Sequence, residues 1–409
     1  MQVVHERCGG LDVHKRTVVV CVIVPEGREV RTFGTMTREL LEMVDWLLNK
    51  RVTHVAMESS GVYWRPLFNL LEGRGIELLV VNARHVKAVP GRKTDVKDAE
   101  WLADLLRHGL LKASFVPDRR QRELRELVRY RKTLVEEHAR MVTRIQKVLE
   151  GANIKLSSVA SNVVGKSGKA MLEQLAAGNE DAEAMAELAW SNLRSKRGQL
   201  REALIGSMGE HQRFMLKSHL RLVEEMEAEV EAVNAQLEER MRPFESQIAL
   251  LDQIPGIGTT SAQQILAEIG VDMSRFPTAD HLASWARVCP GLNESGGKRH
   301  PASTGAGNPW LRSTLIEVAL AAVKAGRRQP NFFSARYHRL SNRRGPKRAA
   351  MAVAHSLLIA IYNMLRNGSY FVDLGPTHYD QRRRDLIANR SVRRLEELGY
   401  KVSIEEAVA

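Results

Sequence analysis

The stretch at positions 8–24 reads CGGLDVHKRTVVVCVIV, and it decides the fold of the N-terminal part of the chain. Two short runs rich in Val, residues 9–13 and 17–24, flank a polar turn at 14–16, which is typical of two paired β-strands. Pro25 and Gly27 mark a second turn, and a third strand is expected at 29–34. We therefore predict that the chain opens with a three-stranded antiparallel sheet.

Helical and extended segments alternate after this sheet. The apolar spacing predicts helices over 37–50, 62–71 and 95–108, with strands at 53–58 and 76–81 between them. The order βββαβαβα predicts an α/β domain over residues 1–115. In an RNase H-like sheet of this order the first and fourth strands are neighbours.

Four acidic residues fall where such a sheet would bring them together. Asp12 interrupts the apolar first strand, Glu58 ends the fourth strand, and Asp95 and Asp98 lie three residues apart at the start of the next helix. Any single acid among the 48 Asp and Glu residues is more often an ordinary surface group, so the prediction depends on the combination. Clustered carboxylates repel one another unless cations neutralise them. We therefore predict a site for Mg²⁺, with two ions about 3.5 to 4 Å apart, suited to phosphodiester chemistry.

Long amphipathic helices are predicted for residues 116–245. Apolar residues recur at steps of three and four over 119–150 and again over 216–241, which indicates a coiled coil. Packing within one chain and pairing between subunits are both compatible with this pattern. Residues 151–209 are rich in small and polar residues and are interpreted as an insertion.

A third region, residues 246–370, begins with a turn rich in glycine. Gly256 and Gly258 precede a predicted helix at 261–269, which is the form of a helix-hairpin-helix. Such a hairpin can bring backbone N–H groups against a DNA phosphate without reading sequence. Simple turn chemistry is the alternative interpretation.

The same region carries a serine on a loop bordered by glycines. Ser295 is followed by Gly296 and Gly297, and Lys298, Arg299 and Arg312 supply positive charge nearby. A hydroxyl in this setting suits attack on a phosphate, although an exposed turn with a capping serine shares the same composition. Residues 327–348 add basic residues with Phe332, Phe333 and Tyr337 among them, a composition suited to phosphate contact and base stacking. A charged, solvated loop is the alternative. The tail, residues 371–409, carries no motif.

Composition narrows the classes of partner. Lys and Arg number 61 against 48 Asp and Glu, which gives a net charge of +13 and favours a polyanion such as nucleic acid. The three cysteines have no metal-binding spacing, which fits a reducing cytoplasm. No signal peptide is evident, and polar residues interrupt the apolar run at 349–365, which predicts a buried helix instead of a membrane span. No Walker-type ATP-binding loop is present.

Together these motifs resemble the insertion-sequence transposases of the "one-ten" family. The matching blocks are GLDVHK at 10–15, ESSG at 58–61, KTDVKDA at 93–99, and SGGK at 295–298 with GNPWLR at 307–312. The resemblance implies a RuvC-like DEDD domain followed by a serine-bearing transposase domain. It also implies a site-specific DNA recombinase guided by a structured bridge RNA.

Carried over residue by residue, the resemblance assigns the DEDD positions to Asp12, Glu58, Asp95 and Asp98. It assigns the nucleophile to Ser295, with Ser303 as the fallback. The expected partners are double-stranded DNA, the bridge RNA and further copies of the chain as a dimer or tetramer, with an active site shared between subunits. A hydrolytic nuclease of the junction-resolvase type and a noncatalytic nucleic-acid-binding protein are the alternatives.

Overall fold

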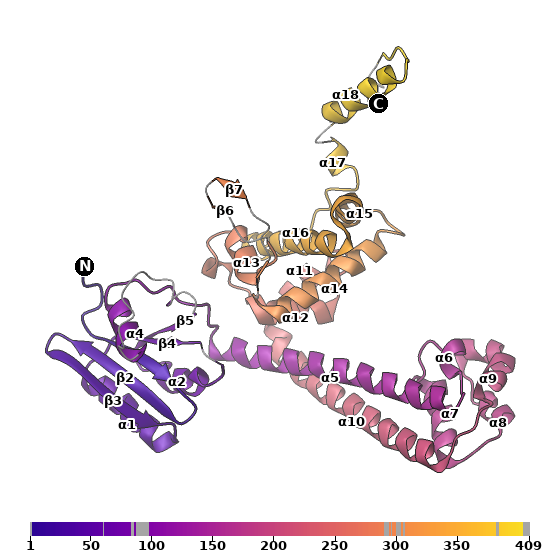
Figure 1. Cartoon of the computed structure of the whole chain (residues 1–409), viewed down its shortest axis with the longest axis horizontal. Helices are drawn as coiled ribbons and strands as arrows, with labels where there is room; N and C mark the ends of the chain where they lie inside the picture. Colours follow the sequence, from indigo (N-terminus) through magenta and orange to yellow (C-terminus); the bar gives the residue numbers. More distant parts are fainter. Residues whose placement is uncertain are drawn as a thin grey trace. The chain divides into compact units, whose positions relative to one another are not determined.

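The computed structural model describes residues 2–59, 61–82, 86, 98–289, 294–295, 297–299, 304–305, 307–381 and 384–403. These residues form two compact units, Met1–Arg120 and Gln121–Ala409, and each is described by itself. The first unit holds a mixed α/β sheet, and the second is almost entirely helical (Figure 1).

The first unit is built on a five-stranded sheet with the order β3-β2-β1-β4-β5. Its strands are β1 (Cys8–Val13), β2 (Thr17–Val24), β3 (Gly27–Gly34), β4 (His54–Glu58) and β5 (Glu77–Val81). The first three strands pair antiparallel, and β4 and β5 join parallel to β1. The prediction that the first and fourth strands are neighbours is confirmed. The mixed α/β character of this unit is confirmed with it.

Helices cover both faces of this sheet (Figure 1). The helices α1 (Thr37–Asn49) and α2 (Trp64–Leu71) bury Leu11, Met57 and other apolar side chains of one face. The other face packs against α4 (Asp98–Arg107), where Cys8, Ala56 and Ala103 share one apolar cluster. Successive strand residues point to opposite faces, so the α4 face also receives the residues at positions 10, 12 and 58.

Two long helices of the second unit run side by side and form an arm (Figure 1). These are α5 (Arg119–Gly151) and α10 (Glu210–Met241). Glu123 pairs with Arg240 near one end, and His138 pairs with Glu227 farther along, so the two helices are antiparallel. The predicted coiled-coil seam is therefore filled within one chain, which was one of the two arrangements that the sequence allowed.

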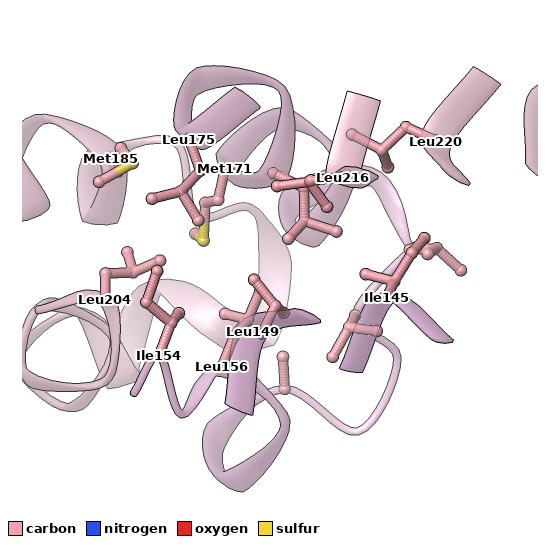
Figure 2. Close-up of a cluster of buried hydrophobic side chains, with 14 of the residues drawn as sticks. Ile145, Leu149, Ile154, Leu156, Met171, Leu175, Met185, Leu204, Leu216 and Leu220 are labelled. Carbon is pink, nitrogen blue, oxygen red and sulfur yellow. The ribbon is translucent and has the colours of Figure 1, made fainter. Parts of the chain in front are cut away.

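A group of short helices lies at the far end of the arm. These are α6 (Leu156–Val159), α7 (Lys166–Ala177), α8 (Ala182–Glu187), η1 (Ser191–Lys196) and α9 (Arg197–Leu204). Figure 2 shows how their apolar side chains meet those of the arm: Ile145 of α5 and Leu216 of α10 share one cluster with Met171 and Leu204. The tip therefore has a hydrophobic core continuous with the seam of the arm.

The rest of the second unit is a helical body. It comprises η2 (Arg242–Phe244), α11 (Glu245–Asp252), α12 (Thr259–Ile269), η3 (Met273–Arg275), α13 (Ala279–Ala286), β6 (Glu294–Ser295), β7 (Lys298–Arg299), α14 (Pro309–Ala325), α15 (Phe332–Arg344) and α16 (Pro346–Asn367). The tail adds α17 (His378–Gln381) and α18 (Arg384–Glu397).

The central helix of this body is α16, which packs against α13, α14 and α15. Among the described residues it is the one helix long and apolar enough to cross a membrane by length and composition. Val353, Leu357 and Ile361 are completely buried within the body. The helix therefore packs as a core helix of this body, as the sequence predicted.

Candidate active site

Asp12 and Glu58 end adjacent strands at the same edge of the sheet. The last parallel pair between β1 and β4 is Leu11 with Met57, and Asp12 and Glu58 are the next residue on each strand. Since residues in register on parallel strands point to the same face, both carboxylates belong to the α4 face. Both side chains are partly exposed. This edge of the sheet therefore presents two predicted site residues together.

The helix α4 brings a third acid toward this edge. Gly10 approaches the backbone of α4 so closely that an added Cβ would lie 2.2 Å from the Ala99 oxygen. The Cys8 thiol contacts the Ala103 oxygen, and the backbone N–H of Val4 donates to the Arg107 oxygen. The helix α4 therefore runs antiparallel to β1. Its first residue, Asp98, lies toward the end of β1 that carries Asp12.

The donor chemistry of this edge fits a hard cation. Asp12, Glu58 and Asp98 offer only carboxylate oxygens, which Mg²⁺ and similar ions prefer. Asp95, the fourth predicted ligand, lies outside the described residues. Among the residues that are described, no three His, Cys, Asp or Glu side chains are grouped closely enough to hold a metal ion. The fold thus brings the three acids to one edge without closing them into a complete ligand set.

His14 contacts the predicted site directly, and the sequence motif gave it no role. Its Nε2 lies 2.9 Å from Oδ2 of Asp12. The turn that carries His14 is closed by a bond from its own backbone N–H to the Thr17 oxygen. The polar turn between β1 and β2 therefore folds an imidazole back onto the carboxylate. The i, i+2 spacing of Asp12 and His14 is the signal that could have indicated this contact.

The predicted serine nucleophile lies on a small β-hairpin of the second unit. Ser295 pairs with Lys298 across the two strands β6 and β7. Gly297 in the connecting turn has φ +71°, a conformation that glycine adopts without strain. The side chain of Lys298 is exposed. The side chains of Ser295 and Arg299, and the whole of Ser303, lie outside the described residues.

The two ends of the segment that carries this hairpin meet at Arg287 and at Gly305 and Gly307. We call these three residues the neck. Gly307 has φ +54°, and a Cβ there would lie 2.5 Å from Cβ of Arg287, just before the segment begins. Nη1 of Arg312 donates to the Gly305 oxygen at 3.0 Å. Arg312, predicted to bind nucleic acid, therefore also holds the downstream side of the neck.

A buried polar network anchors the neck to the arm. The Glu268 carboxylate is 2% exposed and accepts two hydrogen bonds from Arg129, at 2.7 and 2.8 Å. Nδ2 of Asn308 donates to Oε2 of Glu268 at 2.7 Å, while Oδ1 of Asn308 caps the N-terminus of α14. Arg125 also lies beside Glu268, and burial lowers the pKa of its guanidinium to about 10. This network ties α5, α12 and the residue after the neck into one unit, and sequence reasoning missed it.

The glycine turn predicted to contact DNA has two different environments. Gly256 has φ +90°, and a Cβ there would lie 2.5 Å from the backbone N of Ala322 in α14. Close packing therefore explains the glycine at position 256. Gly258, by contrast, is exposed at the N-cap of α12. The helices α11 and α12 flank this turn, and a helix-hairpin-helix that contacts nucleic acid stays a prediction.

Family comparisons match both parts of the chain. A DEDD model of the IS110 type, described as "Transposase", matches residues 9–154 and so includes the acidic edge. A second model, described as "Transposase IS116/IS110/IS902 family", matches residues 248–337 and includes the serine hairpin and the neck. The chain belongs to the IS110 family of transposases. It is therefore an enzyme that cuts and rejoins DNA.

Individual relatives agree with this assignment. The transposase for insertion sequence element IS1111A of Coxiella burnetii is 22% identical over 87% of this chain and 88% of its own length. The pilin gene-inverting protein of Moraxella lacunata is 23% identical over 88% of this chain and 96% of its own length. An uncharacterized IS110 protein of Streptomyces coelicolor is 31% identical over 38% of this chain, and that match spans 37% of the relative.

The structure corrects the prediction that aromatic rings at 327–348 stack on bases. It forms α15 and the start of α16, and Phe333 is buried in the helical body. The ring of Phe332 stacks on Tyr379 of the tail, with centroids 5.3 Å apart. Base stacking by these two rings was part of the prediction. Phe333 is therefore not available to bases, and one face of Phe332 is covered by protein.

Proposed function

We propose that this IS110 transposase is a site-specific recombinase that excises and inserts its element through a covalent serine–DNA intermediate. The placement of Asp12 and Glu58 on adjacent strands, with the start of α4 directed to the same edge, is the observation that carries the proposal. Relatives named as a transposase and as a pilin gene-inverting protein support a reaction in which DNA is both cut and rejoined. We place the reaction in the cytoplasm.

The proposed metal ligands are Asp12, Glu58, Asp95 and Asp98. Mg²⁺, when bound, supplies positive charge for the scissile phosphate and for the oxygens that attack and leave. The carboxylates need such a cation because they repel one another at close range. The positive end of the α4 dipole, which is directed to this edge, lowers that repulsion further. The imidazole of His14 holds the Asp12 carboxylate in one orientation through their 2.9 Å contact.

The proposed nucleophile is the Ser295 hydroxyl. Its oxygen attacks the phosphorus, a P–O bond of the DNA backbone breaks, and a phosphoserine ester forms. The hydroxyl gives up its proton and the departing DNA oxygen gains one, so the step is balanced. One phosphoester replaces another, and the strand can therefore be resealed without ATP. Lys298, paired with Ser295 in the hairpin, and Arg299 supply positive charge for the phosphate.

The proposed partners follow from the family. Double-stranded DNA at the element ends and at the target is the substrate, and a structured bridge RNA guides the choice of site. The turn at Gly256 and Gly258 and the basic groups Lys298, Arg299 and Arg312 contact the nucleic acid. We propose a dimer or tetramer in which Asp12 of one subunit serves Ser295 of another. A mixture of Asp12→Ala and Ser295→Ala subunits should then recover activity, and a mixture that stays inactive would count against sharing.

The chemical step is tested by trapping the covalent intermediate. The protein is incubated with labelled DNA that carries the element ends, guide RNA and Mg²⁺, and adducts that survive SDS are counted. We expect Ser295→Ala to abolish the adduct and strand exchange, Ser303→Ala to retain both, and Asp12→Asn to lose cleavage as well. If Ser295→Ala still cuts DNA without an adduct, the enzyme is a hydrolytic nuclease of the junction-resolvase type. If only Ser303→Ala loses the adduct, Ser303 is the nucleophile.

A further inference from the structure

The turn between α15 and α16 carries an uncompensated positive charge. We call Arg343, Arg344, Lys347 and Arg348 the basic corner, and all four side chains are exposed. None of them has a carboxylate within ion-pair distance among the described residues. Elsewhere in this unit exposed arginines do pair: Arg140 with Glu136, and Arg221 with Glu225. The basic corner is therefore a place where no carboxylate in the described part of the chain offsets the positive charge.

Two of these charges stand where a helix disfavours them. Lys347 and Arg348 lie in the first turn of α16, next to its Pro at position 346, and this turn contains no acid. Cations at a helix N-terminus oppose the helix dipole, whereas anions are favoured there. Helix stability therefore gives no reason for these residues, and a bound anion would relieve the repulsion.

The contacts of the tail with α15 bear on whether the basic corner suits single-stranded or duplex nucleic acid. Phe371 stacks on Phe333, and Tyr379 stacks on Phe332. The guanidinium of Arg336 contacts the Tyr379 hydroxyl, and the Arg339 guanidinium lies 5.1 Å from the centre of the same ring. Proteins that grip single strands use free aromatic rings as stacking platforms. The tail already contacts two of these rings, and no aromatic residue lies at positions 341–348. The basic corner therefore offers charge without stacking, which suits the backbone of a duplex.

We propose that the basic corner holds the phosphate backbone of the duplex DNA on which the enzyme acts. The helix α16 packs against α13 and α14, which border the serine-bearing segment, so the corner belongs to the same helical body as the proposed nucleophile. Contact is made to phosphates by four cations, and it is independent of base sequence. This inference rests on the proposed function only for the identity of the duplex as DNA.

The test compares the salt dependence of DNA binding in two matched variants. The first carries Arg343→Gln, Arg344→Gln, Lys347→Gln and Arg348→Gln. The control removes four arginines that have carboxylate partners in the arm and tip, of which Arg197 is half-buried and the others are exposed: Arg140→Gln, Arg197→Gln, Arg201→Gln and Arg221→Gln. Both variants lose the same charge. Binding to a 30-base-pair duplex of arbitrary sequence is measured by fluorescence anisotropy between 50 and 200 mM salt, with thermal unfolding as the check on folding.

Each phosphate contact contributes about 0.9 to the slope of log K against log salt. The corner variant is therefore expected to lower the slope by about 3 to 4, so that its affinity changes roughly 100-fold less than that of the parent across this range. The control should retain a slope within about one contact of the parent. Equal losses in both variants, or an unchanged slope in the corner variant, would overturn the proposal.

A parallel titration with a duplex RNA separates the two nucleic acids. A loss confined to duplex RNA would refute DNA as the ligand. Binding requires no chemistry, so this result is independent of the serine adduct. If the parent enzyme forms no adduct, the proposed mechanism is contradicted. If the corner variant nevertheless shows the smaller slope of log K against log salt, this inference still holds.

Discussion

Removing the Glu268 carboxylate should destabilise the second unit more than any change at an exposed ion pair. The side chain is 2% exposed and is hydrogen-bonded to both Arg129 and Asn308. Glu268→Ala leaves the Arg129 guanidinium without its counterion and leaves Arg125 beside a cavity. Breaking one side of a buried ion pair costs about 3–5 kcal/mol. The loss should fall in that range because both partners are largely shielded from water.

The measurement is urea unfolding followed by tryptophan fluorescence. Arg129 lies 5.6 Å from the centre of the Trp310 ring and Arg125 lies 6.0 Å from that of Trp285, so the emission should report on this network. The matched control is Glu225→Ala, which removes an exposed i, i+4 pair with Arg221 and should cost about 0.5 kcal/mol or less. If the two variants differ by less than about 1 kcal/mol, Glu268 does not anchor the neck as described.

Two further outcomes follow from the first unit. Gly10→Ala should separate β1 from α4 and abolish Mg²⁺-dependent cleavage, because the added Cβ would meet the α4 backbone. The control Gly151→Ala, whose Cβ would meet nothing within 4 Å, should keep both the fold and the activity. Circular dichroism and a cleavage assay check this, and an active Gly10→Ala enzyme would refute it. Burial raises the pKa of Cys8 and Cys21 to about 11, so at pH 8 about one in a thousand of these thiols is ionised. Alkylation at pH 8 should therefore modify Cys289 first and reach the other two as the pH approaches 11 or the protein unfolds; mass spectrometry of timed samples would expose the opposite order.

The strands and the acidic edge could be predicted because their signals are local. Short runs rich in Val and Ile give the strands, and Asp12 interrupts one such run while Glu58 ends another. The pairing of the first strand with the fourth then follows from the order of the elements in an RNase H-like sheet. The long helices were predictable for the same reason, since their apolar seam repeats over many turns.

Contacts between distant segments could not be predicted in this way. Glu268 and Arg129 are 139 residues apart, and nothing in either local stretch indicates the other. Asn308 is a partial exception, because an Asn followed by Pro is a common start of a helix and indicates the cap it provides to α14. The covering of Phe332 by Tyr379 was also invisible, since a tail without a motif gives no sign of where it packs.

The length of the antiparallel arm sets the distance between the tip and the helical body. With 33 residues, α5 extends about 50 Å at 1.5 Å per residue. Because the apolar seam repeats every seven residues, one added repeat in each of α5 and α10 would push the tip outward by about 10 Å without turning it. Evolution or an engineer could thus change how far this transposase reaches while leaving its chemistry untouched.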